Sequence, residues 1–205
     1  MRVSKKTKEE TRVKILAAAE KLFLRNGYEQ TTTRDIASAA DIAAGTLFNY
    51  FPSKETLVMT MVADAMAKGG ENYRKRRSEQ ESVEEDLFLL ISSELRCLRP
   101  FRKFIGPVLE STMSLFSKSK SCPTGESSRV EHLNTVKEII TADGACRIPD
   151  FIAVSLYWSL YLGILAFWSN DRSRNQEETM AMIDYSLKIF AQTIRGDADE
   201  REEIP

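Results

Sequence analysis

The segment TTTRDIASAADIAAGTLFNYFPSKETL, residues 31–57, decides how the rest of this sequence is interpreted. It predicts two short helices joined by a tight turn and followed by the start of a third helix. Asp35 stands three residues after Thr32, a spacing that satisfies the free amides at a helix start. The residue before a proline is disfavoured in helical conformation, so Phe51-Pro52 should end the second helix. This arrangement is typical of helix-turn-helix proteins, whose second helix enters the major groove of DNA.

Three parts of this region, TTTRDIA, GTLFNYF and PSKETL, resemble the DNA-binding motif of the tetracycline-repressor (TetR) family of bacterial transcriptional regulators. The resemblance extends upstream through Ile15 to Arg25 and covers roughly the first 60 residues. Asp41 departs from the family pattern, which usually has glycine at this turn position; aspartate tolerates the left-handed conformation better than most residues. The resemblance implies three N-terminal helices that read DNA and six that form a ligand-binding body. It also implies that the last two helices pair with their copies as a four-helix dimer interface.

Composition agrees with a soluble DNA-binding protein once the charge is divided along the chain. The net charge is −1 over 205 residues, but residues 1–60 hold ten Lys/Arg and seven Asp/Glu, so the head is basic and the remainder acidic. The cysteines Cys97, Cys122 and Cys146 are expected to be free thiols in a reducing compartment. The N-terminus lacks the apolar core of a signal peptide. We therefore expect a cytoplasmic protein.

No pattern in the chain indicates catalysis. His132 is the single histidine, and we expect an ordinary helix-surface histidine rather than part of a metal site or a Ser-His-Asp site. No phosphate-binding loop is present in the sequence, and we expect no cofactor and no metal. The chain is interpreted as a non-enzyme.

Hydrophobic periodicity predicts an all-α protein of about nine helices with no convincing strand. We expect a DNA-binding domain over 1–54, an effector-binding and dimerisation domain over 55–196, and an acidic tail over 197–205. The basic arm Met1–Lys8 is either a frayed end or an arm that touches DNA. Beyond the motif, helices are expected near 53–68, 83–99, 101–116, 129–141, 151–168 and 176–194, with a loop at 117–128 and a bend at Gly69-Gly70.

The candidate DNA contacts follow from helix starts and side-chain chemistry. Thr33, Thr46, Tyr50 and Lys54 are candidates for phosphate contacts, because free amides and the helix dipole favour phosphate near helix starts. Arg34 can pair with a guanine edge, as the matching family position often touches bases, although a plain surface arginine is the alternative. The remaining candidates are Ala44 against a thymine methyl, Gly45 for close backbone approach, and Phe48 and Asn49. Leu47 and Phe51 are expected in the core.

The stretch FIAVSLYWSLYLGILAFW, residues 151–168, carries no charge and is just long enough to span a membrane. Serines and tyrosines in its middle argue against insertion, and small residues on one stripe would let another helix approach closely. We therefore expect burial between a core and a partner subunit. The candidate dimer residues are Ser155, Ser159, Gly163 and Ala166 on this stripe and Ile183, Leu187 and Phe190 on the last helix.

The family resemblance implies a cavity for a small molecule whose binding changes the spacing of two DNA-reading heads. The candidate lining residues are Met66, Phe104, Met113, Trp158, Tyr161 and Leu162, although residues of these types are more often simply core. Arg102 could meet an acidic ligand or simply lie on the surface.

These features together predict a homodimeric transcriptional regulator that binds a double-stranded, palindromic operator. The most plausible form is a repressor released by a small apolar or amphipathic effector, with no membrane involved. Two alternatives stay open. The body could be a dimerisation scaffold without a ligand, or the chain could be a helical interaction or membrane-associated protein.

Overall fold

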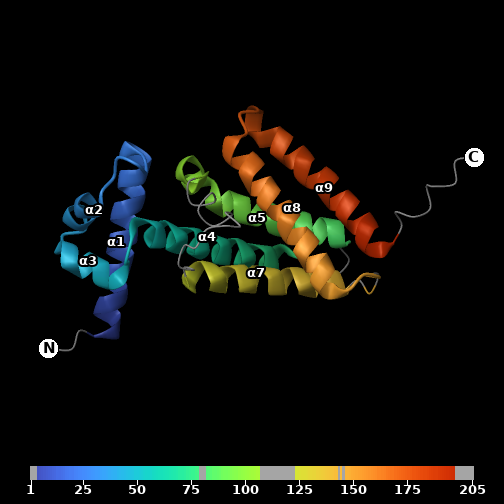
Figure 1. Cartoon of the computed structure of the whole chain (residues 1–205), viewed down its shortest axis with the longest axis horizontal. Coiled ribbons are helices and arrows are strands. Elements are labelled where there is room, and N and C mark those ends of the chain that lie inside the picture. The colour runs from blue at the N-terminus through green and yellow to red at the C-terminus, as the bar shows by residue number, and fades with distance from the viewer. Residues whose placement is uncertain (1–3, 79–81, 107–122, 143, 145, 197–205) are drawn as a thin grey trace, which may run out of the picture. The chain divides into compact units, whose positions relative to one another are not determined.

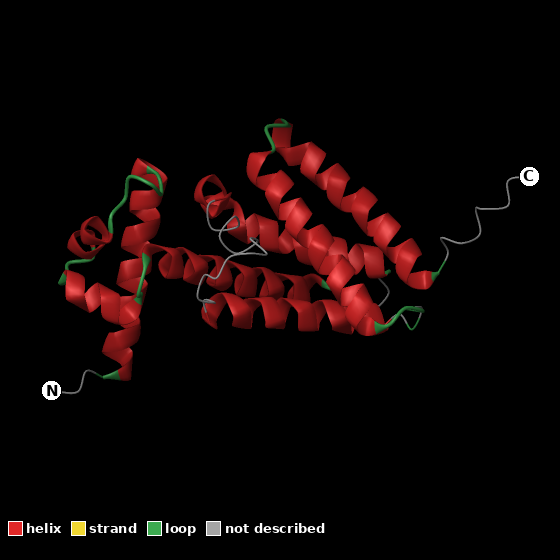
Figure 2. Ribbon diagram, viewed as in Figure 1, coloured by secondary structure: helices red, strands yellow, loops and turns green. Residues whose placement is uncertain are grey.

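The structure is a computed structural model that describes residues 4–78, 82–106, 123–142, 144 and 146–196. Within those ranges the chain is helical and contains no strand (Figure 2), which confirms the all-α prediction. The described α-helices are α1 Lys5–Asn26, α2 Thr33–Ala39, α3 Ala44–Tyr50, α4 Lys54–Arg76, α5 Val83–Leu98, α7 Pro123–Ala142, α8 Asp150–Asn170 and α9 Glu177–Arg195. Two 3-10 turns, Arg99–Phe101 and Arg174–Gln176, precede helical residues 102–106 and α9, respectively.

Two sequence-based boundaries were wrong. The helix expected to weaken at Gly69-Gly70 continues to Arg76. Glycine suits position 69 because α5 comes close there: a Cβ at Gly69 would stand 2.6 Å from the Cα of Glu94. Residues 123–128, expected in a loop, form the first turns of α7, whose first residue Pro123 is well suited to that position. The remainder of that loop, 117–122, and residues 107–116 of the predicted helix lie outside the described residues.

The chain divides into two compact units. Unit 1 comprises Met1–Asp64 and Leu98–Glu126, and unit 2 comprises Ala65–Cys97 and Ser127–Pro205. The first division between these units falls after Asp64, within α4. The predicted boundary between the two domains, between residues 54 and 55, stays a prediction. Much of the predicted basic arm is helical, since Ser4 caps α1 and accepts a hydrogen bond from the Thr7 amide at 3.1 Å.

The core of unit 1 joins α1, α2, α3 and the start of α4. Ile15, Ile36, Leu47 and Leu57 are fully buried there. Residues 98–106 add to it, with the Phe104 ring centroid 5.3 Å from that of Phe23. The two seven-residue helices are therefore held by burial against longer ones, because helices this short are marginal by themselves.

The core of unit 2 is formed by α5, α7, α8, α9 and the later part of α4, and α8 and α9 lie side by side (Figure 1). Its fully buried side chains include Ile91 of α5, Trp168 of α8 and Ile183 of α9. Arg195 near the end of α9 donates two hydrogen bonds to the Glu84 carboxylate, at 2.7 and 2.9 Å. That ion pair joins the end of α9 to the start of α5.

By length and composition α8 is apolar enough to cross a membrane, and 33% of its most apolar window is buried inside the chain. Its buried residues include Tyr157, Tyr161 and Trp168, which carry polar atoms into unit 2. This helix supplies part of the core of unit 2, and core helices of soluble proteins commonly meet the same length and composition test.

Candidate nucleic-acid interface

Helix α2 begins with the reciprocal cap that its sequence predicts. The hydroxyl of Thr32 accepts a hydrogen bond from the Asp35 amide at 3.2 Å, and the Asp35 carboxylate accepts one from the Thr32 amide at 2.9 Å. Hydrogen bonds from the Thr32 hydroxyl and amide hold the pKa of Asp35 below its usual value. Ile36 and Ala37 face the core, so the cap and the buried face together orient the exposed side of α2.

The turn between α2 and α3 contains Asp41, where the sequence departs from the family pattern. Asp41 adopts a left-handed conformation with φ of 54°. Its amide donates to the Ser38 carbonyl at 3.1 Å, and the Ile42 amide donates to the Ala37 carbonyl at 3.0 Å. The turn is therefore closed by backbone hydrogen bonds despite a non-glycine residue at its left-handed position.

Helix α3 buries one side and exposes the other. Leu47 is fully buried, and Phe51, the C-cap residue of α3, is 3% exposed. This confirms the prediction that both are core residues. Phe48 is 48% exposed, an unusually open position for a phenylalanine. Ala43 is the N-cap residue of α3, and no side chain caps the start of this helix with a hydrogen bond. The outward side of α3 therefore presents backbone at Gly45, the ring of Phe48 and the polar side chain of Asn49.

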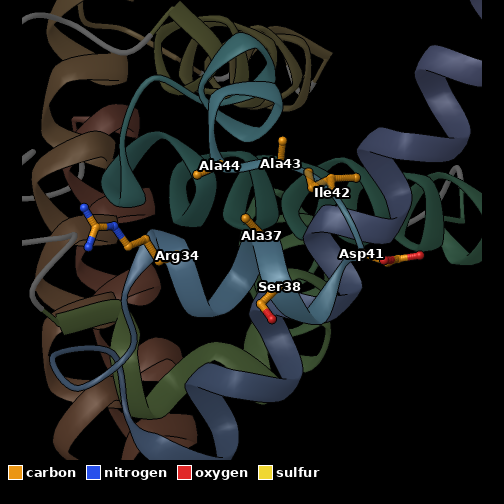
Figure 3. Close-up of a pocket in the computed structure, with 7 residues that line it drawn as sticks. All are labelled: Arg34, Ala37, Ser38, Asp41, Ile42, Ala43 and Ala44. Carbon is orange, nitrogen blue, oxygen red and sulfur yellow. The ribbon is translucent and has the colours of Figure 1, made fainter.

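An open groove of about 510 Å³ lies between α2 and the start of α3. Figure 3 shows Arg34 at one end and Asp41 at the other, with small side chains between them. The residues that line the groove are Arg34, Ala37, Ser38, Asp41, Ile42, Ala43 and Ala44. Alanine and serine leave room for a base edge or a sugar–phosphate strand, and the arginine supplies a forked donor that matches guanine.

Lys54, a predicted phosphate contact, is hydrogen-bonded within the chain. Its ammonium donates to the backbone carbonyls of Tyr28 at 2.8 Å and Thr31 at 3.3 Å, and lies 4.1 Å from the centroid of the Tyr28 ring. The Tyr28 hydroxyl in turn donates to Glu55 at 3.2 Å. The lysine ammonium has three N–H donors and these bonds use two of them, so a phosphate contact would use the third. These bonds tie the start of α4 to the segment before α2.

The predicted DNA contacts all reach the surface to some degree. Arg34, Gly45, Phe48 and Asn49 are exposed, while Thr33, Ala44, Thr46, Tyr50 and Lys54 are half-buried. Sequence reasoning missed Ser38 and gave Asp41 only a role in the turn. The available signal was spacing, because Ser38 follows Arg34 by four residues and so shares its side of α2.

The predicted ligand residues are divided between the two units, and their role stays a prediction. Met66, Trp158 and Tyr161 belong to unit 2, whereas Phe104 packs on Phe23 in unit 1. Arg102 and Leu162 are half-buried, and Met113 lies outside the described residues.

The expectation of a surface histidine at position 132 was wrong. His132 is 5% exposed and hydrogen-bonded through Nδ1 to the Glu94 carboxylate at 2.8 Å. Helix α7 turns this position toward the core of unit 2. A single histidine in a polar stretch of sequence gives no sign that it will be buried. Among the described residues, no group of three or more His, Cys, Asp or Glu side chains could hold a metal ion.

The predicted dimer residues separate by helix. On α8, Ser155 and Ser159 are exposed and Gly163 and Ala166 half-buried. On α9, Ile183, Leu187 and Phe190 are at most 2% exposed, because their side of the helix packs inside the protomer. The apolar side chains that α8 and α9 do expose are Phe151, Ile152, Leu156, Phe167, Tyr185 and Ile189.

Two family profiles match this chain. One, described as bacterial regulatory proteins of the tetR family, matches residues 15–60. The other, described as the tetracyclin repressor-like C-terminal domain, matches residues 87–198, more than half of the 205 residues. The first profile covers α2 and α3 with the groove between them, and the second covers most of unit 2.

Among curated proteins, the chain is 32% identical over 76 residues to the regulator QacR of Staphylococcus aureus, covering 37% of this chain and 40% of QacR. It is 30% identical over 93 residues to the fatty acid metabolism regulator protein of Bacillus subtilis, covering 45% of this chain and 48% of that protein. The matched region is thus less than half the length of either relative.

Among solved structures, Thermus thermophilus FadR in complex with lauroyl-CoA superposes with a TM-score of 0.71 at 19% identity, over 95% of this chain and 98% of FadR. Bacillus subtilis FadR in complex with stearoyl-CoA superposes with a TM-score of 0.64 at 20% identity, over 87% and 96%. Identities this low establish the shared fold. With both halves of the chain matched by family profiles, the chain belongs to the TetR family of bacterial regulatory proteins.

Proposed function

We propose that this chain is a homodimeric DNA-binding transcriptional regulator, acting as a repressor whose operator binding is relieved by a small effector. The observation that carries the proposal is the groove between α2 and α3, open to solvent, with Arg34 at one end. The named relatives are transcriptional regulators, so we assign no catalytic activity. We assign operator reading to residues 1–54 and effector binding and dimerisation to residues 55–196, with 197–205 as a tail.

Arg34 is the proposed base-reading residue, because its exposed guanidinium can donate two parallel hydrogen bonds to a guanine edge. Ser38, Ala44 and Phe48 would then contribute a hydroxyl and apolar surface for thymine methyl groups. Ala43, Ala44 and Gly45 offer no polar side chains, so we expect DNA shape to carry part of the specificity.

The test is footprinting on the DNA that flanks the gene, followed by affinity measurements on the protected site and on random DNA. Arg34→Ala should weaken operator binding by about 1–3 kcal/mol and leave binding to random DNA much less changed. Arg25→Ala removes the same charge from an exposed site at the end of α1 and serves as the control. Equal losses on both DNAs for Arg34→Ala would refute base reading, and no protected site would refute the regulator itself.

The outward surface of α8 and α9 is the proposed dimer interface. Leu156, Tyr185 and Ile189 expose 41, 69 and 48% of their surface, and Ser155, Ser159 and Gly163 keep the adjacent part of α8 low enough for a close helix contact. A twofold dimer uses the same surface on both copies, so its operator should be palindromic with half-sites about one helical turn apart.

The dimer proposal is tested by sedimentation of single-charge variants. Ile189→Asp should give a monomer that loses operator affinity, while Val130→Asp, at an equally exposed valine on α7, should stay dimeric. A dimeric Ile189→Asp protein would place the interface elsewhere.

We propose a cytoplasmic protein and an effector that binds unit 2. Thermal shift against a metabolite library distinguishes an effector-binding body from one that is only a scaffold. The membrane-associated alternative predicts that the purified chain partitions into lipid vesicles and shows no salt-sensitive binding to operator DNA. Burial of Tyr157, Tyr161 and Trp168 on the inner side of α8 favours the soluble regulator.

A further inference from the structure

The lysine at the start of α4 makes three contacts with one short segment of unit 1. Lys54 Nζ donates hydrogen bonds to the carbonyls of Tyr28 at 2.8 Å and Thr31 at 3.3 Å, and it lies 4.1 Å from the Tyr28 ring centroid. Hydrogen bonds from a charged donor are stronger than neutral ones, and the face of an aromatic ring attracts a cation. A single ammonium group therefore holds residues 28–31 to α4. We call these three contacts the Lys54 clamp.

The Tyr28 side chain, on which the ammonium lies, is fixed by two helices. It is 9% exposed, and its ring centroid lies 5.4 Å from that of Phe23 in α1. Its hydroxyl donates to the Glu55 carboxylate of α4 at 3.2 Å. Burial, and then the charge of Glu55, raise the pKa of Tyr28 well above its usual value, so the hydroxyl keeps the proton that it donates. The ring could not turn away from the ammonium without losing contacts to both α1 and α4.

Thr31, at the other end of the segment, connects the clamp to the start of α2. It is 1% exposed, and its hydroxyl donates to the Gly27 carbonyl at 2.8 Å. The Thr31 carbonyl and the Thr32 amide belong to the same planar peptide unit. Lys54 bonds to the carbonyl of this unit, and the Asp35 carboxylate accepts from its amide at 2.9 Å. The clamp therefore orients the peptide unit whose amide completes the reciprocal cap of α2.

Helix α4 gives the clamp a fixed base. Leu57 and Val58, on the first turn after Lys54, are fully buried. Arg34 lies in the first turn of α2, two residues after the Thr32 cap, so its backbone position follows from how that cap is held. Base contacts need close alignment with a base edge, whereas phosphate contacts tolerate many sequences.

We propose that Lys54 is a positioning residue, whose clamp fixes the peptide unit before the α2 cap and thereby sets the position of Arg34 for base reading. The effect on base reading rests on the proposed function, while the clamp itself rests on the geometry of unit 1. The competing role for Lys54 is a direct phosphate contact through its third N–H, and the two roles differ in measurable ways.

Hydrogen exchange of the full-length chain without DNA tests the clamp. Lys54→Met keeps the length of the side chain and removes the ammonium, so the backbone amides of residues 31–36 should exchange about tenfold faster or more. Lys21→Met is the matched control, because it removes an exposed lysine of α1 that makes none of these contacts, and it should leave those amides unchanged. Unchanged exchange in a folded Lys54→Met protein would overturn the proposal.

A milder variant separates the ammonium from the hydroxyl beside it. Tyr28→Phe retains the ring and both carbonyl bonds of Lys54 and loses only the hydrogen bond to Glu55. It should change exchange of the same amides by less than about threefold. A change as large as about tenfold would mean that the Glu55 bond holds the segment, and would overturn the assignment to Lys54.

Affinities for operator and random DNA at several salt concentrations test the consequence for base reading. Lys54→Met should weaken operator binding about fivefold or more and random-DNA binding less than about twofold, with an unchanged salt dependence. A phosphate contact would weaken both DNAs alike and reduce the slope of log affinity against log salt by about 0.9, which would overturn the proposal.

A double-mutant cycle connects the effect to Arg34. In an Arg34→Ala background, Lys54→Met should weaken operator binding by less than about twofold more, because both changes act through one base contact. A further loss of about fivefold would show that the clamp does not act through Arg34.

The exchange measurement needs no DNA, so the two proposals fail separately. If the natural chain binds its operator while Lys54→Met changes neither exchange nor operator affinity, the proposed function stands and this inference falls. If the natural chain protects no DNA, the proposed function and the base-reading effect fall, and exchange alone decides whether the clamp orders the start of α2.

Discussion

The helix-turn-helix of unit 1 and the helical core of unit 2 place their polar side chains in opposite positions. In residues 33–50, Arg34, Ser38 and Asn49 are exposed, and buried apolar residues that include Ile36 and Leu47 hold the two helices on the core. In unit 2, Glu94, His132 and Tyr161 are at most 5% exposed and lie between helices 16 to 21 residues long. One region keeps its polar side chains on the surface, and the other encloses polar side chains between helices.

This difference has a physical basis in helix length. A seven-residue helix has about two turns, so one side is used entirely to attach it and the other is free for recognition. A helix of more than four turns has apolar contacts to spare, and can carry a buried acid whose desolvation is offset by hydrogen bonds from neighbouring helices. Mutations in the helix-turn-helix should therefore act by loosening its short helices from the core of unit 1. Mutations in unit 2 should act by disturbing the packing of its interior.

The largest effect is expected where a short helix loses its attachment. Leu47→Ala in α3 removes a fully buried side chain and should destabilise unit 1 by about 2–5 kcal/mol. Chemical denaturation with a probe of unit 1 measures it. Leu24→Ala, at a leucine 47% exposed on α1, should cost less than about 0.5 kcal/mol. Equal effects would mean that α3 is not held by this contact.

In unit 2 the comparable destabilising substitution adds a side-chain carbon to a close helix contact instead of removing buried atoms. Gly69→Ala would place a Cβ 2.6 Å from the Cα of Glu94, and separating α4 from α5 should cost about 1–3 kcal/mol, more than the helix propensity gained. Gly70→Ala is the matched control, because its Cβ would meet nothing within 4 Å, and it should be neutral or stabilising by up to about 1 kcal/mol. Thermal unfolding of both variants gives the comparison, and a stabilised Gly69→Ala would show that the two helices separate freely.

A smaller, pH-dependent effect is expected for the pair that joins α9 to α5. Burial raises the pKa of Glu84, but the hydrogen bonds and charge of Arg195, together with hydrogen bonds from the backbone and Ser82, outweigh burial and lower the pKa overall. Its contribution is therefore present above the pKa of the unfolded chain and is lost as the pH falls through the lower, folded pKa. Glu84→Gln should cost about 1 kcal/mol at pH 7 and progressively less below about pH 4. Denaturation at several pH values checks this, and a cost independent of pH would exclude the charge as its origin.

The smallest effect is expected at the turn. Asp41→Gly should stabilise unit 1 by about 0.5–1 kcal/mol, because glycine adopts a φ of 54° without steric cost. Asp41→Asn keeps the shape and conformational tolerance while removing the charge. If operator affinity rises equally in both variants, the carboxylate at the end of the groove repels phosphate; a rise confined to glycine would point to strain. Melting curves and operator titrations separate these effects.

Sequence patterns located the helix-turn-helix well because its rules are local. The cap at Thr32 and Asp35, the buried Leu47 and the stop at Phe51-Pro52 depend on neighbours within a few residues. The same reasoning misjudged the helix through Gly69-Gly70, since what makes glycine suitable there is the approach of α5, 25 residues away in the chain at Glu94.

By itself, the sequence determined the all-helical class, the resemblance to the family and the position of the helix-turn-helix, because periodicity, caps and turn residues act over one or two helical turns. Tertiary structure alone decided that His132 is buried against Glu94, that Lys54 is bonded to the carbonyls of Tyr28 and Thr31, and that Ile183, Leu187 and Phe190 face inward. These outcomes depend on which helix faces which, and contacts between residues dozens of positions apart leave no periodic trace in the chain.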